Sequence, residues 1–158
     1  MESLLPFVPH LAHQALFGAL AAAGFGVLFN FGLKALPWCA AAGALALAVR
    51  TIGQDLAWSL EGATFAAAIV TSCSVSALRR ALGPACNAVA LAGCIPMVPG
   101  AFFGQALLGF FAVTAPHPAD AVETFVMASE HIIRVIFTLG AIGAGLVIPA
   151  QLLKNQDF

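Results

Sequence analysis

The sequence predicts an all-α fold, a polytopic membrane bundle of about five transmembrane helices in which one helix is discontinuous. The 158 residues are 61% hydrophobic and only 8% charged, a composition that ordinary soluble domains do not have. The apolar residues also gather into stretches of the roughly 20 residues that a helix needs to cross a bilayer. We expect one transmembrane domain over residues 1–158, with spans at about 11–31, 37–53, 56–78, 85–112 and 124–153.

Charge and cysteine content exclude several classes of function. Six Lys and Arg residues nearly balance seven Asp and Glu residues, so no basic patch predicts a nucleic-acid partner. No pair of the four cysteines has the spacing of a metal or redox motif, which favours cysteines that serve as small packing residues. A metal held by the four histidines would need a convergence in space that their spacing does not show. We therefore expect no metal, no organic cofactor and no catalytic residue.

The first three spans are continuous apolar stretches. The first contains Ala22 and Gly26, and the second contains Ala42 and Ala46. Small residues four positions apart let membrane helices approach closely, so these pairs predict packing contacts. No basic start of a secretory signal precedes the first span, and we expect that the N-terminus is not cleaved.

The fourth span is broken near its middle by the segment Ile95-Pro96-Met97-Val98-Pro99-Gly100. Each proline removes a backbone donor, so the carbonyls of Ala92 and Ile95 lose their helical partners. Ile95 and Val98, which precede the prolines, are expected to leave helical geometry. Freed backbone groups at membrane depth persist only inside protein or beside water, and broken helices often mark transporter substrate sites. A simple proline kink is the alternative.

A second half-helix is predicted to begin at Pro99 and to run to about Phe111, because proline suits the first position of a helix. Its first amides would be free. Free amides and the partial positive charge of a helix start bind an anion without any basic side chain. We therefore predict binding of a small carboxylate or amino acid by the residues of the break, namely Ala92, Ile95, Pro96, Pro99, Gly100, Ala101, Phe102 and Gly104.

The fifth span carries an ionisable face. Glu130 and Arg134 stand four positions apart with the acid first, so they share a helix face and can pair. Charges inside a membrane are costly and usually face a cavity or a partner. His131 adds a group that titrates near physiological pH. These three residues are candidates for gating or proton coupling, with an interfacial ion pair outside the membrane as the alternative.

Three further polar residues are candidates for the same roles. Arg50 and Glu61 flank the short turn 51–55, where Arg50 would steer an anion and Glu61 would relay protons. A plain salt bridge at the turn, such as Arg50 with Asp55, is the alternative. Asn30, near the end of the first span, either lines the path or ends its helix.

Basic residues predict the orientation of the spans. If connecting segments alternate between two sides, Lys34, Arg79, Arg80 and Lys154 fall on one side and only Arg50 falls on the other. The positive-inside rule makes the first side cytoplasmic, which predicts an N-out, C-in arrangement. Five helices with one broken span are too few to enclose an alternating-access path, so we expect a partner subunit or a homo-oligomer.

Several motifs together resemble the threonine/serine exporter family. They are Phe29-Asn30, Ala35-Leu36-Pro37-Trp38-Cys39, Gly43, Arg50, Thr64-Phe65 and, above all, Ile95-Pro96-Met97-Val98-Pro99-Gly100. The resemblance is to the family's short subunit and covers nearly the whole chain. In that family a long protein carries a hydrolase-like domain and ten spans, whereas split members divide the spans between a larger and a smaller partner, and some pairs are associated with succinate export. The resemblance implies a bacterial inner-membrane exporter of small carboxylates or amino acids that works with a larger membrane subunit.

Three hypotheses for function follow from the sequence. The first is a subunit of a secondary exporter, and direct ATP use by this chain is not expected because it has no phosphate-binding loop. The second is a structural subunit that supports its partner and has no substrate site of its own. The third is a membrane-embedded enzyme with Glu130 and His131 as acid and base, which the absence of a convincing nucleophile or ligand motif disfavours.

Overall fold

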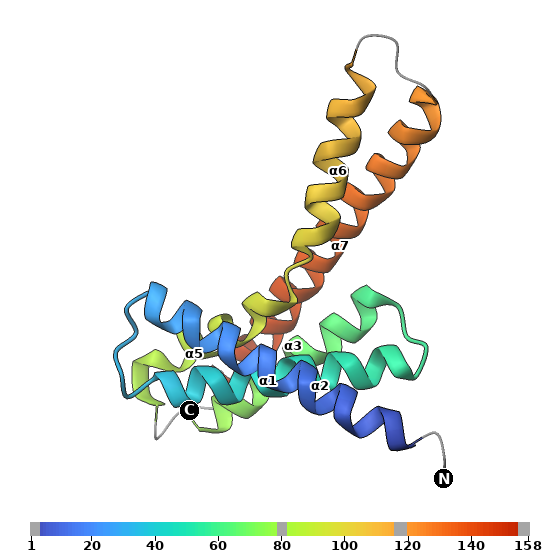
Figure 1. The fold of residues 1–158 in the computed structure, drawn as a ribbon. Coiled ribbons are helices and arrows are strands. Elements are labelled where there is room, and N and C mark those ends of the chain that lie inside the picture. The colour runs from blue at the N-terminus through green and yellow to red at the C-terminus, as the bar shows by residue number, and fades with distance from the viewer. Residues whose placement is uncertain (1–3, 79–81, 116–119, 155–158) are drawn as a thin grey trace. The chain divides into compact units, whose positions relative to one another are not determined.

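The computed structural model describes residues 4–78, 82–115 and 120–154. Every element in this part of the chain is a helix, which confirms the predicted all-α class (Figure 1). The elements are α1 (Leu4–Leu28), α2 (Leu36–Asp55), α3 (Leu60–Ala77), the one-turn 3-10 helix η1 (Gly83–Ala85), α5 (Cys86–Cys94), the 3-10 helix η2 (Ile95–Met97), α6 (Gly100–Val113) and α7 (Ala121–Lys154). Arg79 and Arg80, on which the predicted orientation partly rests, lie outside the described residues.

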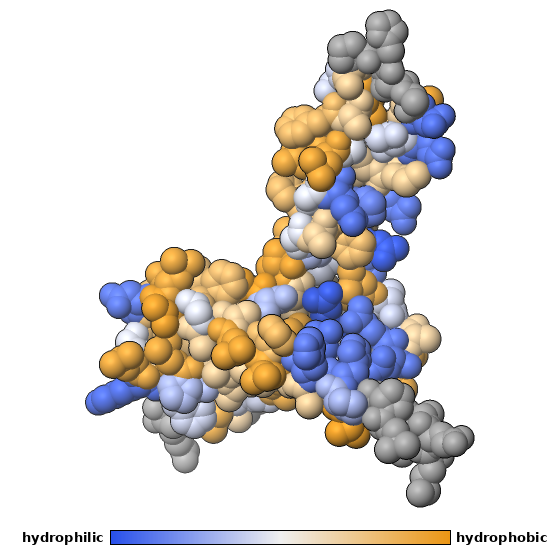
Figure 2. Space-filling view, viewed as in Figure 1, coloured by the Kyte–Doolittle hydropathy of each residue, from blue (hydrophilic) through white to orange (hydrophobic). Residues whose placement is uncertain are grey.

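The helices have the length and composition of membrane spans. Among the described helices, four are long and apolar enough to cross a bilayer: Val8–Leu28, Leu36–Asp55, Leu60–Ala77 and Ala121–Leu152. A fifth span results if the two consecutive segments Cys86–Met97 and Gly100–Val113 are counted as one. Hydrophobic side chains cover most of the visible surface (Figure 2). An apolar exterior of this extent is stable only against lipid or other protein, so the structure is that of a membrane helix bundle.

Contacts divide the described chain into two compact units. Unit 1 contains the described residues up to Met97 together with those from Ala141 onward, and unit 2 contains residues Val98 to Gly140. Helix α7 therefore contributes its first part to unit 2 and its last part to unit 1.

Small residues bring the helices of unit 1 into close contact. A Cβ added at Gly43 of α2 would collide with the carbonyl oxygen of Gly18 and the Cβ of Ala22, both on α1. A Cβ added at Gly93 of α5 would lie 2.6 Å from the Cβ of Ala42 on α2. Lipid supplies no hydrophobic drive for helix association, so close backbone packing of this kind is a main source of stability in the bundle.

The buried core of unit 1 consists mainly of alanine and cysteine. One cluster comprises Ala35, Cys39, Ala42, Val75, Cys86, Val89, Ala90 and Ala92. The other comprises Ala46, Ala67, Ala68, Cys94, Met97 and Ile142, where Met97 is the largest fully buried side chain. The interpretation of the cysteines as packing residues is right for Cys39, Cys86 and Cys94, whereas Cys73 is exposed.

Unit 2 is an antiparallel helical hairpin of α6 and the first part of α7 (Figure 1). Near its far end the rings of Phe110 and Phe125 lie 5.9 Å apart in an edge-on arrangement. A Cβ added at Gly109 would lie 2.8 Å from the Cβ of Ala128, so the two backbones pack closely at that level. The hairpin thereby sets the start of α6 opposite the residues of α7 that follow Ser129.

We predict that Gly43→Ala destabilises unit 1, because the added methyl group collides with the backbone of α1. Overpacking of this kind costs about 1–3 kcal/mol of unfolding free energy. The measurement is the thermal unfolding midpoint of the purified chain in detergent. Gly24→Ala on α1 is the matched control, because a Cβ there meets no described atom within 4 Å; equal midpoints for the two variants would contradict the prediction.

Candidate functional site

The helical break lies at Val98 and Pro99, which belong to neither η2 nor α6. The expectation that Ile95 leaves helical geometry is wrong, because its φ of −57° and ψ of −39° are those of a right-handed helix. The chain tightens into the 3-10 turn η2 around Pro96 instead. A 3-10 turn pairs carbonyls with amides three residues on, so it accommodates the missing donor of a proline without a full interruption.

The start of α6 has two amides without a partner. The helix begins at Gly100 with Pro99 as its N-cap, one residue later than predicted, and no side chain caps it. The amide of Gly100 is not free as expected, because it donates to the carbonyl of Val98 at 2.9 Å. The first helical bond runs from the amide of Phe103 to the carbonyl of Pro99 at 3.2 Å. The amides of Ala101 and Phe102 therefore point out of the helix start with no partner within the described chain.

The ionisable residues of α7 gather around the same end of α6. The guanidinium carbon of Arg134 lies 5.5 Å from the centre of the Phe102 ring, within the range of a cation–π contact. The His131 and Phe102 rings have their centres 5.6 Å apart. A terminal nitrogen of Arg134 lies 3.6 Å from a carboxylate oxygen of Glu130. The hairpin therefore brings Phe102, a predicted binding residue on α6, next to three of the six predicted gating or proton-coupling residues, all on α7.

The charges of this region come from a helix start and one ion pair. A helix start carries about half a unit of positive charge, whereas the positive charge of Arg134 is offset by the carboxylate of Glu130. The Glu130–Arg134 pair is partly open, with side-chain exposures of 66% and 41%. Hydrophilic surface in the hairpin gathers along α7 in Figure 2. The region thus presents two free amides and a guanidinium that has Glu130 as its carboxylate partner.

Gly100 and Gly104 leave space beside the start of α6. A Cβ added at either glycine meets no described atom within 4 Å. These glycines are thus not required for close helix packing within the described chain, unlike Gly43 or Gly109. Their lack of a side chain leaves the helix backbone accessible to a ligand.

Arg50 anchors the residue that precedes the break. Its guanidinium donates a hydrogen bond to the carbonyl oxygen of Met97 at 3.1 Å, rather than pairing with Asp55 at the turn. Its Nε is buried and has no partner among the described residues. Because the Met97 side chain is also fully buried, this residue is held at both its side chain and its backbone. Sequence reasoning selected Arg50 but missed Met97, since no local pattern links positions 47 residues apart.

Two other predicted candidates have local structural roles. Asn30 follows the end of α1 with a φ of +55°, and its amide donates to the carbonyl of Val27 at 3.0 Å. Asparagine tolerates this left-handed conformation at a helix end. Glu61 lies in the first turn of α3, where a carboxylate stabilises the helix dipole. Among the described residues, no group of three His, Cys, Asp or Glu side chains could hold a metal ion.

We predict that Arg50→Leu loosens the break. The carbonyl of Met97 then loses its hydrogen-bond donor. One hydrogen bond contributes about 1 kcal/mol to stability, so its loss is expected to make amide exchange in residues 97–103 roughly fivefold faster. The measurement is hydrogen–deuterium exchange of the chain in lipid nanodiscs. Arg50→Lys keeps a cationic donor and is expected to preserve most of the protection. Identical exchange in the wild type and Arg50→Leu would show that the bond does not hold the segment.

Comparison with known proteins assigns a family to this architecture. A family model for the threonine/serine exporter ThrE matches residues 14–152. A protein of uncharacterised function from Haemophilus influenzae is 32% identical over 151 residues, which make up 95% of this chain and 50% of that relative. The chain therefore spans about half the length of this relative. No solved structure matches the chain. Because the family model covers most of its residues, the chain belongs to the threonine/serine exporter family.

Proposed function

We propose that this chain is a membrane subunit of a secondary exporter of small carboxylates or amino acids, with threonine, serine and succinate-like dicarboxylates as the substrate classes considered. Membership of the exporter family implies a transport subunit. The observation that supports a substrate site on this chain is the pair of unpartnered amides at the start of α6, beside the Phe102–Arg134 contact. Amides at a helix start and a guanidinium are both established binders of carboxylates.

In this proposal the substrate carboxylate binds the amides of Ala101 and Phe102 and competes with Glu130 for Arg134. The ring of Phe102 holds the guanidinium near the helix start. Glu130, His131 and Arg134, which surround Phe102 or pair with one another, are the proposed gating or proton-coupling residues of this site.

The break itself supplies the backbone freedom that such a site needs. Ala92, Ile95 and Pro96 lie before the break and Pro99 lies after it. Arg50 and the buried side chain of Met97 hold the part before the break in unit 1. Arg50 therefore has a positioning role within unit 1, separate from the substrate site proposed on unit 2.

We also propose that the chain works at the bacterial inner membrane with a larger membrane subunit of the same family, or as a homo-oligomer. The relative from Haemophilus influenzae is about twice as long as the matched region, so this region is accompanied by further sequence in that protein. The charged residues of the α6–α7 hairpin would be costly against lipid, and a partner subunit relieves that cost. Large exposed apolar residues on the same hairpin, including Leu108, Val122 and Phe137, suit contact with lipid or protein.

We predict that Gly100→Leu abolishes export, because its side chain fills the open space at the start of α6. The variant is expected to lose the hydrogen bonds between the α6 amides and the substrate carboxylate, which corresponds to an efflux rate at least about tenfold lower. The measurement is efflux of L-threonine, L-serine and succinate from cells that lack the native gene and carry the wild type or the variant. Gly24→Leu is the matched control, because its position is equally open but lies on α1.

The same assay separates the competing hypotheses. Because Gly100 contacts no described side chain, the abundance of Gly100→Leu in the membrane is expected to stay close to that of the wild type. If abundance and efflux fall together, the chain acts as a structural subunit. Normal efflux by Gly100→Leu would refute the proposed substrate site.

A second prediction concerns the ring that positions Arg134. Phe102→Leu removes the contacts with Arg134 and His131 and is expected to lower the efflux rate about two- to fivefold, the factor that corresponds to an exposed cation–π contact. Phe103→Leu is the control, because the Phe103 ring is 52% exposed and has no recorded ring contact within the described chain. Equal efflux by the two variants would show that the ring does not serve the site.

A further inference from the structure

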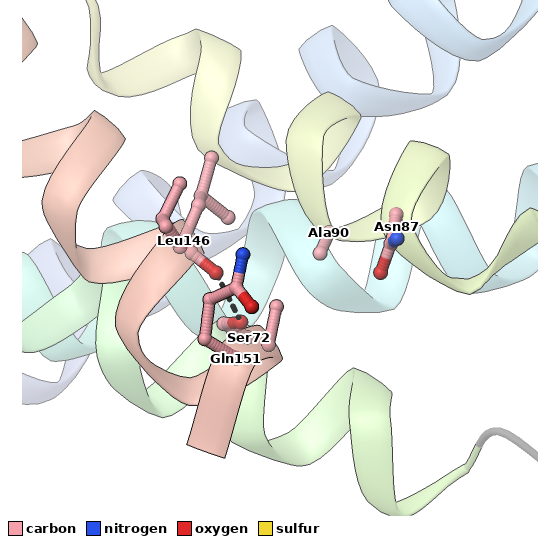
Figure 3. A pocket seen from close by; sticks show the side chains of 7 residues that line it. Ser72, Asn87, Ala90, Leu146 and Gln151 are labelled. Carbon is pink, nitrogen blue, oxygen red and sulfur yellow. Dashed lines mark hydrogen bonds between the residues drawn. The ribbon is translucent and has the colours of Figure 1, made fainter. Parts of the chain in front are cut away.

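A second site lies in unit 1, away from the break along the chain. It is a pocket of about 220 Å³ between the last turns of α3, the first turn of α5 and the end of α7. Its polar lining consists of Ser72, Asn87 and Gln151, and its apolar lining includes Ala90 and Leu146 (Figure 3). Three different helices each supply one polar side chain, so the pocket depends on the tertiary packing of unit 1.

The polar groups of the pocket retain unused hydrogen-bonding capacity. The Ser72 hydroxyl donates to the carbonyl oxygen of Leu146 at 3.2 Å, which leaves the lone pairs of the hydroxyl oxygen free to accept. The side-chain amides of Asn87 and Gln151 have no recorded partner in the described part of the chain. Figure 3 shows the Gln151 amide beside Ser72, with Asn87 in the neighbouring helix. The pocket therefore offers two amide carbonyls, two amide nitrogens and one hydroxyl.

The packing around the pocket explains why it is not filled by the protein. Gly145 of α7 lies so close to α3 that an added Cβ would be 2.6 Å from the Cβ of Ala68. Pro149 follows this contact inside α7. Because proline has no backbone N–H, the carbonyl of Gly145 lacks its usual helical hydrogen bond from position 149. The side chains that follow the contact, Leu146 and Gln151, line the pocket instead of closing it.

Size and charge restrict what this pocket can bind. A volume of 220 Å³ lies below the range of about 300–1,000 Å³ that is usual for drug-sized ligands, so the ligand is of amino-acid size. None of its lining residues is charged. Amide oxygens accept from an ammonium group and amide nitrogens donate to a carboxylate, so a zwitterion uses both kinds of group, whereas a dicarboxylate leaves the amide oxygens unused. The lining thus favours an amino acid over a dicarboxylate.

We propose that this pocket is a loading site for a small zwitterionic amino acid, and that Asn87, Gln151 and Ser72 bind it before it is exported. This inference rests on the proposed transport function and selects one substrate class from it. The pocket lies at the helix ends that the basic residues predict to be cytoplasmic, which is the side from which an exporter must take up its substrate. Unpaired amides near the membrane also gain more from a polar ligand than from lipid.

The first experiment measures binding of L-serine and succinate to the full chain in lipid nanodiscs by calorimetry. Asn87→Ala and Gln151→Ala are each expected to raise the Kd for L-serine about fivefold, the factor for loss of one neutral hydrogen bond. Gln54→Ala is the control, because Gln54 is an exposed amide outside the pocket. Absence of L-serine binding, an unchanged Kd in both pocket variants, or an equal loss of succinate binding would overturn the proposal.

The second experiment locates the ligand without relying on affinity. Asn87→Cys is introduced together with Cys73→Ser, because Cys73 is exposed while the other described cysteines are buried. L-serine is expected to slow the reaction of the new thiol with a small methanethiosulfonate reagent at least threefold, and succinate is expected to leave the rate unchanged. No protection by L-serine would refute the loading site even if a pocket variant folded poorly.

The two proposals fail in distinguishable ways. If Gly100→Leu stops efflux of L-serine but L-serine does not protect the thiol at position 87, the export function stands and the loading site is wrong. If protection is observed in both the wild type and Gly100→Leu while efflux is unaffected by Gly100→Leu, the loading site stands and the substrate site at α6 is wrong.

Discussion

The hydrogen bond from Arg50 to the carbonyl of Met97 is the constraint that fixes the chain just before the break. A proline-containing break leaves backbone groups without helical partners, and the membrane interior supplies none. The protein meets part of this demand with a guanidinium from another helix and with the buried side chain of Met97. The residue before the break is therefore fixed within unit 1. The free amides of Ala101 and Phe102, which carry the proposed substrate site, belong to unit 2.

The frame that supports this constraint is made of small side chains. Gly43, Gly93 and Gly145 each sit where an added Cβ would collide with a neighbouring helix. The buried clusters consist largely of alanine and cysteine, while the bulky leucines, valines and phenylalanines lie mostly on the exterior. This inversion of the usual soluble core follows from the solvent, because lipid accepts large apolar side chains and close backbone contact supplies the association energy.

Two regions of the chain differ in their charge and hence in the solutes that suit them. The start of α6 combines free amides and a helix dipole with the Glu130–Arg134 ion pair. The pocket of Ser72, Asn87 and Gln151 has no charged lining residue and offers amide oxygens as well as amide nitrogens. In the two proposals made above, an amino acid suits both regions, because its carboxylate binds amide donors and its ammonium group binds amide oxygens.

The sequence by itself determined the all-α membrane class, the approximate spans and the position of the break, because these follow from local composition and from proline chemistry; short motifs carried the family resemblance. It also identified Arg50, Glu130 and Arg134 and predicted the pairing of Glu130 with Arg134, because residues four apart share a helix face. Only the tertiary structure decided that Arg50 binds Met97 and that Arg134 contacts Phe102. The contact of Phe102 with His131 and Arg134 depends on the rotation of two antiparallel helices, and the pocket depends on three helices meeting at one level. An apolar sequence does not fix how each helix is rotated about its own axis, because small residues that permit close contact occur on several faces. Which polar side chains meet is therefore decided by the packing of the helices.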